Sequence, residues 1–340
     1  MAYSETEIRK VQITGKGTFV VSLPKWWVKT LKLKKGDLIE IKPLLSSSLL
    51  VSLHKRKTSK ESYFISLDAS QFESIDDLFR NIISNYLIGY DMFRISLKDK
   101  NATYKMELKE KIIKKLIGTE IIEESPDEVV VQCLLKNSDF SLKKLTDRIS
   151  ILAMSMHVDL LRSLRDKSSN VTYDLMEKRD DEVDRLYFFI VRQLNKAIRD
   201  PSFLEALGML RITDSFSYII AIKSIERVAD HAVSISRVIN TISSSAQSNV
   251  IELTLSMYSK SLELFEYSVR ALQKSEITID YPFSKLKEIE ELNETVVNKI
   301  VSSCKDIKFA VDLRLVVESI KRVAEYSADI AEATMNIKVQ

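Results

Sequence analysis

The sequence predicts a multidomain protein with a small β-rich head, a small α+β middle domain and an all-α C-terminal half made of two three-helix bundles. Half of the six glycines fall in the first 60 residues, and strand and helix patterns alternate over 61–138. From residue 141 onward only one glycine and two prolines interrupt apolar residues spaced three and four apart. We therefore expect domains at 1–60, 61–138 and 139–340, with helical repeats at 139–245 and 246–340.

The first 60 residues contain short apolar stretches separated by turn residues. Strands are expected at 11–13, 19–23, 38–41 and 49–53, and a short helix at 25–31 begins after Pro24. The segment holds 13 Lys and Arg against 4 Asp and Glu, a net charge of +9, whereas the rest of the chain carries −6. This charge indicates a polyanionic partner for the head alone.

Residues 61–138 alternate between strand and helix patterns, as in a small α+β domain. The expected strands are 63–67, 92–97, 120–123 and 129–134, and the expected helices are 75–88 and 106–117. Because the segment shows no chemical motif, we expect a spacer or a dimerisation module, and a ligand site is the alternative.

The C-terminal half is predicted to consist of long helices. They are expected at 142–167, 171–198, 202–243, 247–273, 283–304 and 308–337. The heptapeptide SIERVAD that begins at Ser224 recurs as SIKRVAE at Ser319, which indicates a duplicated unit.

Two pairs of carboxylates form the candidate binding site. Asp180 and Asp184 border the apolar stripe of the second long helix, and Glu226 and Asp230 lie on the outer flank of the third. Like charges one turn apart repel each other, and a cation that bridges both helices would offset the repulsion. Oxygen ligands favour Mg, Mn, Ca or ferric iron over zinc. The alternative is that both pairs are solvated helix surface.

No enzyme is indicated. None of the three histidines follows a Glu by three residues, as a ferritin-like di-iron site requires, and His231 is expected on the surface. Cys133 and Cys304 are expected to be small core residues. Without an apolar run of membrane-spanning length or a signal peptide pattern, the protein is expected to be cytoplasmic and not inserted in a membrane.

The sequences RDDEVD at 179–184 and IERVAD at 225–230 resemble the paired acidic motifs of the PhoU family of phosphate-uptake regulators. The resemblance covers residues 142–340. It implies two three-helix bundles and a metal cluster with iron as the first candidate, Mg, Mn, Ca, Zn or Ni being alternatives. The implied ligands are Asp180, Asp184, Glu226 and Asp230.

The second repeat departs from this family pattern. Ile289 and Asn293 stand at the acidic positions of one motif, and the other motif reads from Lys321 to Glu325. Because Lys321 supplies within the chain the positive charge that a metal would bring, we expect no metal in the second repeat.

Residues 8–53 resemble the SpoVT/AbrB family of swapped-hairpin DNA-binding domains. The resemblance is carried by IRKV from Ile8, GKG from Gly15, Leu23-Pro24, Thr30-Leu31 and KGD from Lys35. It implies an interlaced homodimer whose basic side chains contact DNA phosphates, which supports affinity more than base discrimination. The candidate DNA-binding residues are Arg9, Lys10, Lys16, Lys25 and Lys29. Trp26 and Trp27 are expected in the core or the dimer interface.

Together the two resemblances imply a cytoplasmic homodimer that regulates transcription, binding DNA through its head and responding to phosphate status through its helical half. One alternative is a metal-binding adaptor that regulates a phosphate ABC transporter or a signalling protein by protein contacts. In that case the head would be a dimerisation module that does not bind DNA. No catalytic residue is expected in either case.

Overall fold

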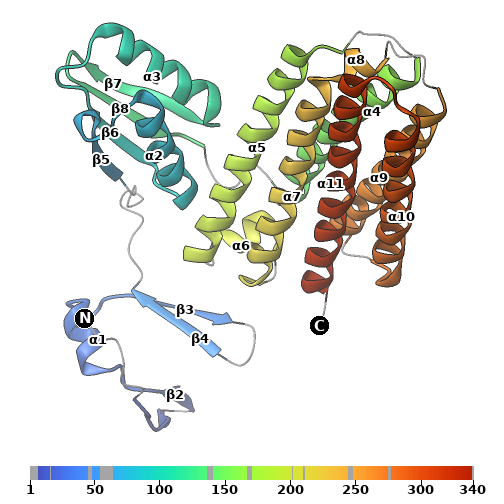
Figure 1. Cartoon of the computed structure of the whole chain (residues 1–340). Helices are drawn as coiled ribbons and strands as arrows, with labels where there is room; N and C mark the ends of the chain where they lie inside the picture. Colours follow the sequence, from blue (N-terminus) through green and yellow to red (C-terminus); the bar gives the residue numbers. More distant parts are fainter. Residues whose placement is uncertain are drawn as a thin grey trace. The chain divides into compact units, whose positions relative to one another are not determined.

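The computed structural model describes most of the chain, in two compact units that comprise residues 1–61 and 62–340 (Figure 1). The described residues are 7–15, 17–44, 48–53, 64–135, 141–166, 171–200, 202–209, 211–243, 248–274 and 277–338. The predicted DNA-binding residue Lys16 lies outside them.

The head contains the four strands and the short helix that its sequence predicts. Strand β1 (Gln12–Thr14) pairs antiparallel with β2 (Thr18–Val20), and β3 (Ile39–Leu44) pairs antiparallel with β4 (Ser48–Leu53); helix α1 spans Lys25–Thr30. None of the described side chains of the head is buried. Val11, Phe19 and Leu38 are 65, 71 and 66% exposed, so the described part of this unit encloses no core within a single chain.

The middle domain is a four-stranded sheet with two helices. In chain order its elements are β5 (Phe64–Asp68), α2 (Ile75–Ile88), β6 (Met92–Ser96), α3 (Ala102–Lys115), β7 (Thr119–Ser125) and β8 (Glu128–Cys133). The strand order is β5-β6-β8-β7, with β5 parallel to β6 and the other pairs antiparallel. Leu78 and Ile82 of α2 and Ile112 of α3 share one buried core with Phe93 and Val131 of the sheet.

The C-terminal region is helical. Its elements are α4 (Leu142–Asp166), α5 (Tyr173–Arg199), α6 (Ser202–Leu207), α7 (Asp214–Ser236), α8 (Ile239–Ser243), α9 (Ser248–Lys274), α10 (Asp280–Ser303) and α11 (Ile307–Lys338). The continuous helix expected at 202–243 is wrong. Gly208, at a left-handed φ of 72°, ends α6, and the chain resumes a long helix only at Asp214.

The duplicated heptapeptide lies where α7 and α11 pack side by side (Figure 1). Ile225 and Ile320, which are equivalent in the two copies, belong to the same continuous core. His231 and Tyr326, the residues that follow the two copies, contact each other with ring centroids 5.7 Å apart. Helices α7 and α11 run in opposite directions, because Arg227 lies near Asp329 whereas the later His231 lies near Glu318, so equivalent residues meet only near this point. His231 is half-buried rather than on the surface, and its Nδ1 is fully enclosed.

The middle domain is held on α5 by a buried arginine. Arg192, 2% exposed, donates hydrogen bonds to the carbonyl oxygens of Tyr86 and Tyr90, each at 2.7 Å, and to Asp91 Oδ1 at 2.5 Å. Lys196 adds an ion pair to the same Asp91 oxygen at 2.8 Å. These cations lie at the carboxyl end of α2, where free carbonyls and the helix dipole favour positive charge. The contact fixes which part of the middle domain lies against α5.

In the described part of the chain, no helix combines the length and the apolar character needed to cross a membrane.

Candidate functional site

Helices α5 and α7 bring the four predicted carboxylates together. Asp180 and Asp184 lie on successive turns of α5, and Glu226 and Asp230 lie on successive turns of the adjacent α7. The negative charges of Asp184, Asp230 and Glu226 all act on Asp180, which shows that the four groups share one site. We call these four residues the acidic cluster.

The acidic cluster carries more negative charge than its surroundings stabilise. Burial raises the pKa of Asp180 to about 7, and repulsion from the other three carboxylates acts in the same direction. Burial is also the main cause that raises the pKa values of Asp184 and Glu226. A cation at this site would therefore stabilise the ionised forms.

Two oxygens of the acidic cluster are buried without a hydrogen-bond donor. They are Oδ1 of Asp180 and Oε2 of Glu226. The expectation that Glu226 lies on the outer flank of its helix is wrong, because this residue is only 6% exposed, whereas Asp230 is exposed. The packing of α5 against α7 covers Glu226. Helix periodicity alone does not predict this burial, because it does not show where a neighbouring helix packs.

Lysines that the sequence analysis did not single out neutralise part of the charge. Lys115 Nζ, from the last residue of α3, lies 2.5 Å from Asp181 Oδ1 and 3.3 Å from Asp184 Oδ2. Lys223 Nζ lies 2.5 Å from Glu226 Oε1 and 4.8 Å from the centre of the Tyr187 ring. Helical spacing could have identified Lys223, three residues before Glu226. No local pattern connects Lys115 to a helix that begins nearly 60 residues later.

The donor chemistry of the acidic cluster fits a hard cation. The atoms that the cluster offers to a metal are carboxylate oxygens, which hard cations prefer. Two of these oxygens receive no hydrogen bond from the protein. Among the residues that the structure describes, no three His, Cys, Asp or Glu side chains are grouped closely enough to hold a metal as they stand. In this arrangement Lys115 and Lys223 provide the positive charge beside the cluster.

The second repeat has its own cations at the equivalent position. Lys321 Nζ lies 3.1 Å from Glu325 Oε1, and Arg322 Nη1 lies 2.8 Å from Glu325 Oε2. Ile289 is fully buried, and Asn293 contributes a neutral side chain whose Oδ1 is buried without a donor. The absence of metal from this repeat stays a prediction.

The described DNA-binding candidates are all exposed. Lys25 and Lys29 lie one turn apart on α1, whereas Arg9 and Lys10 lie in the segment before β1, where Arg9 forms an ion pair with Glu7. Trp26 is 43% exposed within a single chain. The structure thus places the two α1 lysines on one face and leaves Arg9 and Lys10 on a separate segment.

Comparisons with known proteins found a similar solved structure and a matching domain family. The crystal structure of PhoU from Pseudomonas aeruginosa is similar, with a TM-score of 0.47 and 16% sequence identity, over 58% of this chain and 94% of that chain. No curated protein is similar in sequence. Residues 146–239 match the PhoU domain, and this range contains all four residues of the acidic cluster. Helices α5 and α7, which carry the acidic cluster, thus lie within the stretch that matches the PhoU domain.

Proposed function

We propose that this chain is a regulator of phosphate uptake that binds a metal ion at its acidic cluster and DNA through a dimer of its head. The observation that carries the proposal is the presence, within a PhoU domain, of two buried carboxylate oxygens without donors. PhoU domains are regulatory, which agrees with the expectation of no catalytic residue.

Asp180, Asp184, Glu226 and Asp230 would hold the metal. A bound hard cation would supply concentrated positive charge and so stabilise the ionised carboxylates. Asp181 and Asp184 would then depend less on Lys115, since both cations offset the same negative charge. Iron is the first candidate, as the family resemblance implies, with Mg, Mn, Ca, Zn or Ni as alternatives.

The contact of Lys115 with Asp184 could couple metal binding at the acidic cluster to the middle domain and the head. It belongs to the middle domain, which Arg192 holds against α5, and the middle domain follows the head in sequence. Metal binding would weaken the Lys115 contact and change how firmly α3 is held beside α5. We propose that this change reaches the head and alters its affinity for DNA. By thermodynamic linkage, DNA binding would then change the affinity for the metal by the same factor.

The head carries exposed side chains that support the proposal of a DNA-binding dimer. Its exposed apolar side chains, among them Phe19 and Leu38, would be covered by a second chain. Lys25 and Lys29 would contact phosphates, and two chains would double the number of contacts. Such binding weakens steeply as the salt concentration rises.

The metal proposal is tested by measuring bound metal in the purified full-length protein by mass spectrometry. Asp180→Asn with Glu226→Gln should lose the metal, because both changes replace charged ligands with neutral ones of the same size. Glu325→Gln in the second repeat is the matched control and should retain it. Unchanged metal in the folded double variant would refute the assignment.

The DNA proposal is tested by mobility shifts of genomic fragments between about 50 and 200 mM salt, where several phosphate contacts change affinity by orders of magnitude. Lys25→Ala with Lys29→Ala should weaken binding and flatten its salt dependence. Lys143→Ala with Lys144→Ala, on α4, removes the same charge outside the head and should change little. If the intact protein shifts no fragment at low salt, the adaptor that regulates a phosphate transporter becomes the better account.

A further inference from the structure

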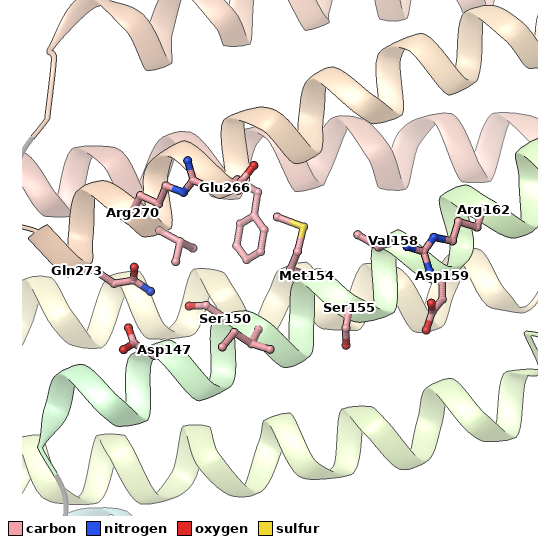
Figure 2. Close-up of a pocket in the computed structure, with 13 residues that line it drawn as sticks. Asp147, Ser150, Met154, Ser155, Val158, Asp159, Arg162, Glu266, Arg270 and Gln273 are labelled. Carbon is pink, nitrogen blue, oxygen red and sulfur yellow. Dashed lines mark hydrogen bonds and ion pairs between the residues drawn. The ribbon is translucent and has the colours of Figure 1, made fainter.

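Helices α4 and α9 border an open groove of about 700 Å³ (Figure 2). The two helices run antiparallel, since His157 of α4 hydrogen-bonds Tyr258 of α9, while Asp147 lies near Gln273 (Figure 2). Ile151, Met154, Val158, Phe265 and Val269 line the groove with apolar surface. The groove is thus an apolar channel between two antiparallel helices.

The apolar lining on α4 has the spacing of a helix-packing seam. Ile151, Met154 and Val158 are three and four residues apart, which places them in one row along the helix. Ile151 is 66% exposed, an unusual position for a large aliphatic side chain in such a row. The row is therefore suited to packing against another helix.

The charges at the two ends of the groove are opposite. Asp147 lies at one end and Arg162 at the other (Figure 2), and in the described part of the chain neither forms an ion pair. Asp147 Oδ1 is buried without a hydrogen-bond donor. The other lining charges are neutralised, because Glu266 pairs with Arg270 at 2.5 Å and Asp159 pairs with Arg179 at 2.6 Å.

We propose that the groove is an interface with a second copy of this chain, in which the two α4 helices pack antiparallel about a two-fold axis between Met154 and Ser155. Residues at equal distances from this axis then meet. Ile151 packs on the partner's Val158, and Asp147 pairs with the partner's Arg162, each contact occurring twice. The surface is self-complementary in apolar contact and in charge.

The same axis brings the two α9 helices together. The four helices then form a bundle in which every neighbouring pair is antiparallel, and Phe265 and Val269 join its core. The stretch from Asp147 to Arg162 covers about 22 Å at 1.5 Å per residue, roughly four helical turns. One foreign helix would leave half of such a bundle open, so the second copy is the better occupant.

This interface lies wholly within the unit of residues 62–340 and does not depend on pairing of the head. Its test must therefore report on the groove itself rather than on total mass. Disulfide cross-linking of the full chain meets this need, because two cysteines join only when their Cβ atoms come within about 3.5–4.5 Å. Cys304 is replaced by Ser in every variant, and Cys133 is buried.

Ser155→Cys, beside the axis, should cross-link to itself under mild oxidation. Arg148→Cys is the control, because this exposed α4 residue does not line the groove. Ile151→Cys mixed with Val158→Cys should form the mixed disulfide but neither homodimer, since only the unlike positions meet. This second pair keeps the test valid if Ser155→Cys folds poorly. Absence of both cross-links in folded protein would overturn the proposal.

Charge exchange tests the register. In the Ser155→Cys background, Asp147→Arg or Arg162→Asp alone places like charges opposite each other twice and should slow cross-linking on the order of tenfold. The combined exchange restores opposite charges and should recover the parent rate. If the single changes have no effect, or the combined exchange does not recover the rate, the proposed two-fold contact is wrong and the groove accepts a different partner.

Discussion

Lys115 is the only charged side chain of the middle domain that contacts the acidic cluster among the described residues. Replacing Lys115 with Met removes this charge and leaves an unbranched apolar side chain that is one atom shorter. The Lys115 side chain is 26% exposed, and its ammonium contacts two carboxylates, at 2.5 and 3.3 Å. The change leaves Asp184 half-buried without this partner, and burial already raises its pKa. We expect the metal-free protein to lose about 1–3 kcal/mol of unfolding free energy.

The same change should strengthen metal binding. Because Lys115 and a bound cation offset the same charges, the metal no longer competes with the ammonium in the variant. Each 1.4 kcal/mol gained in the binding free energy of the metal corresponds to about a tenfold higher affinity. Urea unfolding with EDTA and with Mn²⁺ measures the stability difference, and calorimetric titration measures the affinity. The variant should be less stable than the parent with EDTA and recover with Mn²⁺.

Lys114→Met is the matched control, since Lys114 is the exposed neighbour on the same turn of α3 and forms no ion pair among the described residues. Equal unfolding midpoints for the two variants in EDTA would show that the Lys115 contact adds no stability. Weaker metal binding by Lys115→Met than by Lys114→Met would refute the competition between Lys115 and the metal.

Three further predictions concern the helical half and the middle domain. The pKa of Asp180, raised from 3.8 to about 7, means that the folded state binds the additional proton between these values, so the unfolding free energy of the metal-free protein should fall as pH rises from about 4 to 7. Asp180→Asn should remove at most about 4 kcal/mol of that fall, measured by urea unfolding across pH; an unchanged pH profile would contradict the assigned pKa. Arg192→Met leaves the carbonyls of Tyr86 and Tyr90 and the Asp91 carboxylate without their donor, so it should cost about 3–5 kcal/mol and increase hydrogen exchange at the end of α2, whereas unchanged exchange would show that Arg192 does not hold the domains together. Tyr258→Phe removes the hydroxyl 2.6 Å from His157 Nδ1 in a fully buried pair and should cost about 1–3 kcal/mol in thermal unfolding, whereas a stability within 0.5 kcal/mol of the parent would show that the bond is not needed.

Element boundaries were predictable where local signals were strong. The helix of the middle domain expected at 75–88 is confirmed, because Ser74 caps its start and Gly89, at a φ of 110°, ends it. The next helix starts at Ala102, earlier than residue 106, since Asn101 accepts a hydrogen bond from the Tyr104 amide. That cap was visible in the sequence, but the apolar pattern used to place the helix began later.

The break after α6 was harder to predict. Gly208 lies between segments with helical apolar spacing, and a single glycine inside such a pattern is often tolerated. The turn after it depends on contacts formed elsewhere in the chain, such as the hydrogen bond from Arg211 to the carbonyl oxygen of Ile337 in α11. A bond across more than a hundred residues leaves no mark in the local pattern.

The sequence by itself determined the duplicated helices and the spacing of Asp180, Asp184, Glu226 and Asp230, because helical periodicity and i, i+4 pairing are properties of consecutive residues. Only the tertiary structure decided that Glu226 is buried, that Lys115 of α3 neutralises Asp184, and that His231 meets Tyr326. These outcomes depend on which helix faces pack together. That packing is set by the whole core, so the charge balance of the acidic cluster became known only once α3, α5 and α7 were in place.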